Sequence, residues 1–479
     1  MRRALPLLLL AVLAAQTDAA EVRADAPPVP TIAPDLAAPL RALKAAVKDA
    51  KVGVYVVDLD GDKVLAFSDE HTPLNPASNA KLYTAAAALA MLHPEHRYET
   101  SLAGKVKDGA IAGLVLRGHG DPSLVAEDLH AMARELHDRG VRKVDDVLVD
   151  QRFFDDKTTP PAFEQKPSEW AAFRAPIAAV SLDENTVTLT VRPEGEGATA
   201  HAWFEPRGFV DVEGSVSTSG PGAQDTVTLA LAPNGKRLSA KLGGSVSADA
   251  RLVRYTRRVD DPTLLAGYAL KAELDDAGIK VGGEVKAGSA AKAPVLVRHT
   301  SAPLAQLLFE LGKQSDNFYA EMVFKTIAAE QKGRPAASED SAAIVTKWLQ
   351  SIDAWDEGMA IKNGSGLYDA NRVTTWSAVQ LLRWSWRSDI QPDYVAQLAI
   401  GGEDGTLHKR FRAVKGHRSI RPKTGTLEGA IALSGYVLGP PGKAPIAFSV
   451  VMNGVEGHAS DARTAIDKFV AHVAGMKWP

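Results

Sequence analysis

The chain has 479 residues, of which 45% are apolar and 24% charged, with a formal net charge of −3 and a pI of about 6.5. This balance is globular, and the length exceeds one ordinary hydrophobic core, so about two or three domains are expected. It excludes a polybasic nucleic-acid or membrane-surface binder. The absence of cysteine excludes disulfides, thiol catalysis and iron–sulfur clusters.

Residues 1–20 have the pattern of a secretory signal peptide. Arg2 and Arg3 form a positive start, the apolar run 4–15 follows, and small residues close the segment. The run is shorter than the roughly 20 apolar residues that a membrane-spanning helix needs, and an uncleaved anchor is the alternative interpretation. We expect an exported protein of a bacterial periplasm, with no membrane span in the mature chain.

A proline-rich linker is predicted for residues 21–34, followed by a helix with an apolar face. That face consists of Leu36, Leu40, Leu43 and Val47. The run 52–57 predicts a strand, Asp60-Gly61 a hairpin turn, and 63–67 the returning strand.

Residues 77–91 are rich in alanine and leucine and contain no glycine or proline, which predicts a helix. Pro76 interrupts the preceding pattern. The helix therefore places Ser78 near its N-terminus and Lys81 one turn later on the same face. Residues 35–98 are interpreted as the first part of a catalytic domain.

The interval 99–298 differs from residues 35–98, because its short apolar runs alternate with Gly, Pro and Asp. Strands are predicted at 111–116, 147–149, 186–191 and 227–231. Helices are predicted at 124–136 and 263–276. We interpret the interval as one or two mostly β inserted domains.

Residues 299–479 are interpreted as the second part of the catalytic domain. Helices are predicted at 304–311 and 318–327, and a closing helix at 461–473. The runs 430–438 and 446–452 are separated by Gly439-Pro440-Pro441-Gly442 and predict an antiparallel meander.

Three short motifs occur in order along the chain. They are Ser78-Asn79-Ala80-Lys81, Ser315-Asp316-Asn317 and Lys423-Thr424-Gly425. At average residue frequencies, Ser-x-x-Lys alone is expected about once in a chain of this length, and Lys-Thr-Gly in about one such chain in ten. Taken singly, Ser78 fits a helix cap, Lys81 a solvated helix charge and Lys423-Thr424-Gly425 a strand edge. Their order, with the first at a helix start and the third before a strand, favours an active site.

The first motif suits nucleophilic catalysis. A serine hydroxyl is a weak nucleophile that needs a base within hydrogen-bond reach, and Lys81 is the available base for Ser78. A lysine acts as a base only when burial or a nearby cation lowers its pKa, and Lys423 could be that cation. No cluster with zinc-ligand spacing is present, so no metal or other cofactor is expected. The isolated His119 is interpreted as a turn residue.

The motif set resembles that of penicillin-binding proteins and class A β-lactamases. The long gap between the first two motifs is similar to the class C low-molecular-mass penicillin-binding proteins, which are D-alanyl-D-alanine carboxypeptidases and endopeptidases. Further stretches resemble that family, with His119 in place of a more usual serine and Asn363 in place of an acid. They are Pro76–Leu82, Gly118–Pro122, Asn363–Leu367 and Gly405–Leu407.

The resemblance implies an α+β fold, in which a transpeptidase-like domain with an antiparallel sheet and helices is interrupted by mostly β insertions. It implies an acyl-serine peptidase of peptidoglycan stem peptides that β-lactam antibiotics inhibit. The alternatives to this peptidase function are a serine β-lactamase and a non-catalytic cell-wall-binding protein.

The same resemblance assigns roles to the motif residues. Ser315 would relay a proton to the leaving amine, and Asn317 would bind the substrate amide and hold Lys81. Lys423 and Thr424 would bind the substrate carboxylate, while Gly425 lets the strand approach closely. The N–H groups of Ser78 and Thr426 would form the oxyanion hole.

Overall fold

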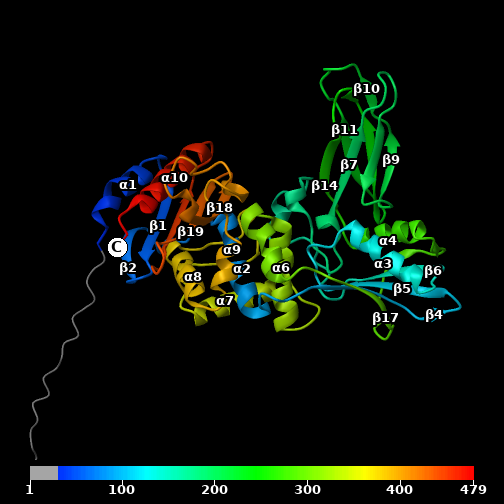
Figure 1. Cartoon of the computed structure of the whole chain (residues 1–479), viewed down its shortest axis with the longest axis horizontal. Coiled ribbons are helices and arrows are strands. Elements are labelled where there is room, and N and C mark those ends of the chain that lie inside the picture. Colours follow the sequence, from blue (N-terminus) through cyan, green and yellow to red (C-terminus); the bar gives the residue numbers. More distant parts are fainter. Residues whose placement is uncertain (1–30, 479) are drawn as a thin grey trace, which may run out of the picture. The chain divides into compact units, whose positions relative to one another are not determined.

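The computed structural model describes residues 31–478 (Figure 1). The predicted signal peptide, residues 1–20, and most of the predicted linker lie outside the described residues. Residues Ile32–Pro479 form one compact unit. Within the part of the chain that is described, no helix combines the length and the apolar character needed to cross a membrane.

The two ends of the described chain build one five-stranded sheet, in the order β18-β19-β20-β1-β2. Its strands are β1 (Lys51–Asp58), β2 (Lys63–Ser68), β18 (Ile420–Leu427), β19 (Ala430–Val437) and β20 (Ile446–Asn453). β1 pairs antiparallel with β20 from Lys51↔Asn453 to Asp58↔Ile446. In Figure 1 the blue strand β1 accordingly lies beside the orange-to-red strands of the chain's end. The predicted hairpin and meander are both present.

Helices cover both faces of this sheet, so the central strands β19 and β20 are buried on both sides. On one face lie α1 (Pro34–Lys44) and α10 (Ala459–Gly475), whose apolar residues share a core with the strands. The other face packs against a larger helical layer that holds the second hydrophobic core. That layer contains α2 (Ala80–Leu92), α5 (Leu304–Phe309), α6 (Asn317–Gln331), α7 (Ser338–Ser351), α8 (Thr375–Arg387) and α9 (Gln391–Ala396).

The middle of the chain contains a seven-stranded sheet with the path β15-β6-β5-β3-β17. Its strands are β3 (Glu99–Ala103), β4 (Val106–Lys107), β5 (Ala110–Gly118), β6 (Lys143–Asp150), β15 (Lys280–Val281), β16 (Val285–Ala287) and β17 (Val295–Thr300). Helices α3 (Ala126–Asp138) and α4 (Leu265–Asp276) share its core. β5 and β6 are parallel and α3 connects them, a βαβ unit that the sequence analysis did not anticipate.

Smaller sheets follow within the same interval. One consists of β7 (Thr186–Arg192), β8 (His201–Glu205) and β14 (Val253–Arg258), and another of β9 (Val210–Gly214), β11 (Thr228–Asn234) and β12 (Arg237–Gly243). A two-stranded sheet joins β10 (Ser217–Ser219) to β13 (Ser245–Ser247). The predicted α+β class is confirmed.

The interval 99–298 begins and ends on neighbouring strands, because β3 pairs antiparallel with β17 from Glu99↔Thr300 to Ala103↔Val295. A segment whose two ends meet can be inserted between elements of another domain without separating them. We therefore retain 35–98, 99–298 and 299–479 as a proposed division.

Candidate active site

A strained turn precedes the first motif. Residues Ala77–Asn79 form a short 3-10 helix that leads into α2, and Ala77 has a positive φ of 47°. A non-glycine residue in this region stores strain, which is concentrated at functional sites. The turn leaves Ser78 half-buried at the start of α2, one turn from Lys81.

Lys81 is completely buried and contacts three oxygen atoms. Its Nζ lies 3.1 Å from Ser78 Oγ, 2.6 Å from Asn317 Oδ1 and 2.8 Å from the carbonyl oxygen of Ser365. The last two oxygens can only accept hydrogen bonds. A neutral amine donates one hydrogen to each of them, which leaves its lone pair for the hydroxyl proton of Ser78.

The second motif lies in the turn between two helices. A π-helical turn, η5 (Glu310–Gln314), follows α5 and ends at Ser315, whose φ is 66°. Asp316 then caps α6, since its Oδ1 accepts a hydrogen bond from the N–H of Tyr319 at 2.8 Å. Asn317 is the first residue of α6, so the turn directs its side chain to Lys81.

The third motif lies on β18, the edge strand of the sheet. Lys423 is 1% exposed, and its Nζ donates to Ser315 Oγ at 2.7 Å and to the carbonyl oxygen of Thr424 at 3.0 Å. Thr424 Oγ1 donates to Thr406 Oγ1 at 2.9 Å. An edge strand has unpaired N–H and C=O groups, which an extended substrate can bind.

Gly425 lies against the segment that carries Ser78. A Cβ at this position would be 2.7 Å from the carbonyl oxygen of Pro76. We expect Gly425→Ala to displace β18 from Ser78 and to slow acylation by a β-lactam by roughly 10²-fold, the effect of about 1 Å of misplacement. Stopped-flow acylation kinetics measure this. Gly61→Ala is the control, because a Cβ there meets no atom within 4 Å; equal rates for both variants would contradict the expectation.

Burial dominates the electrostatics of both lysines. It lowers the pKa of Lys81 from 10.5 to about 7, and the negative charges of Asp316 and Glu321 oppose this shift. Burial also lowers the pKa of Lys423 well below its ordinary value, and the nearby Lys81 lowers it further. The sequence analysis anticipated a neighbouring cation as one means of lowering the pKa of Lys81, but burial is the main cause.

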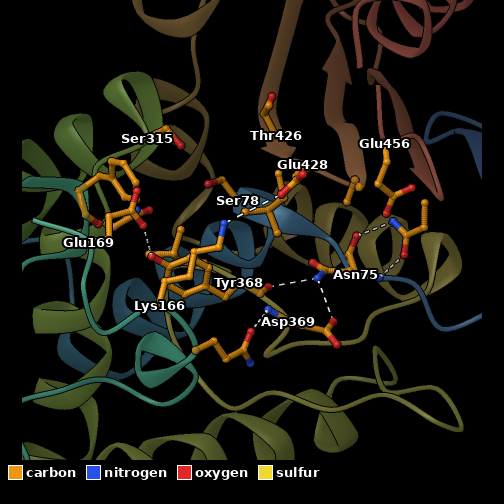
Figure 2. A pocket seen from close by; sticks show the side chains of 18 of the residues that line it. Asn75, Ser78, Lys166, Glu169, Ser315, Tyr368, Asp369, Thr426, Glu428 and Glu456 are labelled. Atoms are coloured by element: carbon orange, nitrogen blue, oxygen red, sulfur yellow. Dashed lines mark hydrogen bonds and ion pairs between the residues drawn. The ribbon is translucent and has the colours of Figure 1, made fainter. Parts of the chain in front are cut away.

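These residues surround a cavity of about 840 Å³ (Figure 2). Ser78, Ser315, Asn317 and Thr426 line it directly, and Figure 2 labels Ser78 and Thr426, which come from elements far apart in the sequence. The two lysines lie buried behind this surface. The structure thus brings all eight sequence-predicted residues together. Within residues 31–478, no three histidine or carboxylate side chains converge as metal ligands would.

Two residues that hold Lys81 in place were not assigned a role from sequence. Ser365 provides one of the acceptors for Lys81, and Glu321 accepts hydrogen bonds from the N–H groups of Gly364 at 3.2 Å and Ser365 at 2.8 Å. Ser365 lies in the stretch Asn363–Leu367, which was noticed only as a resemblance. Glu321 follows Asn317 by one turn of α6, a spacing that could have indicated it.

The inserted interval also contributes to the cavity. Lys166, Glu169 and Phe173 line it, and the carbonyl oxygen of Phe173 accepts a hydrogen bond from Asn317 Nδ2 at 2.9 Å. Tyr368, which also lines the cavity, donates to Glu169 at 2.6 Å. These interval residues come from the segment between β6 and β7, where Phe173 lies in a short 3-10 helix and Lys166 and Glu169 in irregular structure. The segment carries no motif, so the sequence offered no signal for them.

Comparison with known proteins agrees with this geometry. Residues 36–473 match the model of the D-Ala-D-Ala carboxypeptidase 3 (S13) family. A D-alanyl-D-alanine carboxypeptidase of Actinomadura sp. (strain R39) is 35% identical over 456 residues, which cover 91% of this chain and 84% of the relative. D-alanyl-D-alanine carboxypeptidase DacB of Haemophilus influenzae is 25% identical, over 87% of this chain and 88% of the relative.

Solved structures share the fold. The crystal structure of penicillin binding protein 4 from Haemophilus influenzae aligns with a TM-score of 0.77 at 22% identity, covering 91% of this chain and 98% of that one. A predatory endopeptidase from Bdellovibrio bacteriovorus aligns with a TM-score of 0.52 at 15% identity, over 90% of this chain and 96% of that one.

Proposed function

Because the chain belongs to the D-Ala-D-Ala carboxypeptidase 3 (S13) family and is a serine-type D-alanyl-D-alanine carboxypeptidase, we propose that Ser78 is its nucleophile and Lys81 its general base. The observation that carries this assignment is the arrangement around Lys81 Nζ, 3.1 Å from Ser78 Oγ and held by two obligate acceptors. The substrate is a peptidoglycan stem peptide, and the enzyme works outside the cytoplasm, in the periplasm.

The acylation step begins with neutral Lys81. It takes the proton of Ser78 as Oγ attacks the carbonyl carbon of the penultimate D-alanine. The backbone N–H groups of Ser78 and Thr426 stabilise the oxyanion that forms on the carbonyl oxygen. Asn317 holds Lys81 and binds the substrate amide.

Collapse of the tetrahedral intermediate breaks the peptide bond and releases the C-terminal D-alanine. The leaving nitrogen takes a proton from Ser315, and Ser315 takes one in turn from Lys423, whose Nζ lies 2.7 Å from Ser315 Oγ. Lys423 and Thr424 bind the terminal carboxylate of the substrate. That carboxylate favours the protonated form of Lys423, which burial alone disfavours.

Water then hydrolyses the acyl-enzyme: its oxygen bonds to the acyl carbon as the bond to Ser78 Oγ breaks, and the proton that Lys81 received returns to Ser78. The proton that the water loses passes through Ser315 to Lys423, which restores the enzyme. β-Lactams follow the same first step, but ring opening keeps their leaving group attached, so the acyl-enzyme persists. The charged residues around the cavity suit a stem peptide with both an amine and carboxylates. They are Lys166, Glu169, Asp369, Arg372, Glu428 and Glu456.

The acylation rate should depend on the protonation of Lys81. Its pKa is lowered to about 7, so the amine is neutral and basic above that pH and protonated below it. We expect kcat/KM for a D-Ala-D-Ala peptide to rise with pH through an inflection near 7, and to fall roughly tenfold per pH unit below about pH 6. Steady-state kinetics across the pH range measure this. A flat profile through neutrality would contradict the role of Lys81.

The assignment is tested with the mature protein and a peptide that ends in D-Ala-D-Ala. Released D-alanine reports carboxypeptidase action, and cleavage of a crosslinked peptide dimer reports endopeptidase action. Intact-mass spectrometry with benzylpenicillin over hours should show a lasting adduct, which peptide mapping places on Ser78. Rapid turnover of the antibiotic without D-alanine release would instead indicate a β-lactamase, and an adduct on another residue would refute the assignment.

A further inference from the structure

A second cavity, of about 470 Å³, lies apart from the catalytic cleft and shares none of its lining residues. Segments distant in sequence form it: the end of β5 with the turn after it, the end of β6, the chain before β17 and the loop between α6 and α7. Its lining residues are Arg117, Gly118, His119, Asp150, Arg152, Phe153, Ala291, Arg334 and Pro335.

Guanidinium groups dominate this lining. Arg117 and Arg152 both bind Asp150, with Nε–Oδ distances of 3.1 and 2.9 Å, and Ser289 Oγ donates to the same carboxylate at 2.7 Å. Asp150 therefore has its oxygens occupied. Because it can neutralise only one of the two arginines, the pair retains a positive charge.

Arg334 supplies the third guanidinium. It pairs with Glu330 at 2.8 Å and lies 4.3 Å from the centre of the Phe153 ring. Three arginines against Asp150 and Glu330 leave one positive charge uncompensated. The contact with the Phe153 ring is a cation–π interaction, which holds the Arg334 group beside this cavity.

His119 adds a ring nitrogen to this lining. Its Nδ1 lies 3.1 Å from the carbonyl oxygen of Glu99, which can only accept, so Nδ1 carries the hydrogen and donates. The ring packs edge-on against Phe153 at 5.2 Å. Burial and the charges of Arg334 and Arg117 lower the pKa of His119. Nε2 is therefore unprotonated, and a bound anion would allow it to gain a proton and donate a further hydrogen bond.

We propose that this cavity binds a phosphate group between Arg117, Arg152, Arg334 and His119. Arg117 and Arg152 use Nε and Nη2 on protein acceptors and each retain Nη1, while Arg334 uses Nη2 on Glu330 and retains Nε and Nη1. These remaining charged donors suit the oxygens of a phosphate. The ligand is either free phosphate or a phosphate ester of an extracellular polymer. Since the lining comes from the inserted interval and from the α6–α7 loop, bound phosphate links these segments. This inference does not depend on the peptidase reaction.

Isothermal titration calorimetry tests the proposal on the full mature protein with inorganic phosphate. Arg152→Gln and Arg334→Gln should each weaken binding roughly tenfold or more, because each removes a charge-assisted hydrogen bond. Arg139→Gln is the matched control: Arg139 is an exposed arginine paired with Glu135 four residues earlier, as Arg334 is with Glu330. The control should bind phosphate within about twofold of the parent protein. All three variants should unfold at the same temperature as the parent protein.

Two further measurements identify the ligand. Dimethyl phosphate binding as tightly as inorganic phosphate indicates a polymer phosphodiester, and much weaker binding indicates free phosphate; both support the proposal. NMR of labelled histidine should show the pKa of His119 rising when phosphate is added. No heat of binding, equal binding by all variants, or tighter binding of succinate than of phosphate would overturn the proposal.

Discussion

Replacing Ser78 with alanine should abolish acylation by benzylpenicillin and D-alanine release together. This change removes the group that forms the covalent bond in the proposed reaction, so both rates should fall by about 10⁴-fold or more, below detection. Ser78 is half-buried and Lys81 Nζ keeps its contacts with Asn317 and Ser365. The free energy of unfolding should therefore change by less than about 1 kcal/mol. Intact-mass spectrometry and thermal unfolding measure the two effects separately.

Ser315→Ala is the informative comparison. Ser315 contacts Lys423 but is not the nucleophile in the proposed reaction. The variant should still form the benzylpenicillin adduct on Ser78, at a lower rate. If Ser78→Ala formed the adduct while Ser315→Ala did not, the two serines would have to exchange roles.

Replacing Lys81 with methionine should slow acylation roughly 10²- to 10⁴-fold, the usual contribution of a general base. Methionine has a similar length and fits a completely buried site, but it has no lone-pair nitrogen to take the proton of Ser78. The inflection near pH 7 should disappear from the acylation profile, because the group that titrates there is gone. Stopped-flow acylation measured across the pH range detects both changes.

Lys325→Met provides the matched control for a buried lysine. Lys325 is 1% exposed on α6, outside the catalytic cleft, and it binds Asp155 and the carbonyl oxygen of Lys157. Removing it leaves Asp155 without its cation, so the free energy of unfolding should fall by about 3 kcal/mol. The pH profile of the folded enzyme should stay unchanged. Loss of the neutral inflection in Lys325→Met as well would show that the inflection does not report Lys81.

Local order in this protein follows from short-range sequence patterns. The alanine-rich run that starts at the first motif forms α2, and the apolar runs after Lys423-Thr424-Gly425 form β19 and β20 with the expected antiparallel pairing. Helical periodicity and turn residues act over a few positions, so they are visible in the sequence. The π-helical turn before Ser315 was not visible, because its geometry depends on how α5 and α6 pack.

In the interval 99–298, short-range sequence patterns were not sufficient to predict how the strands pair. Four of its strands, β5, β6, β7 and β11, and the helices α3 and α4 were predicted, but its other strands and the parallel pairing of β5 with β6 were not. Apolar runs indicate strands without naming their partners, and the same run suits a parallel or an antiparallel neighbour. The residues that this interval contributes to the cleft, such as Glu169, lie in irregular structure with no periodic signal.

The sequence by itself determined the three motifs, their order and the residue types that the chemistry needs. Only the tertiary structure decided that Lys81 is completely buried, since burial arises from helices and strands far apart in the chain. That burial lowers the pKa of Lys81 to about 7. The tertiary structure also decided the acceptors, because Asn317 and Ser365 reach Lys81 from positions hundreds of residues later. A short motif can specify a nucleophile and a base, but desolvation and long-range hydrogen bonds make the base effective.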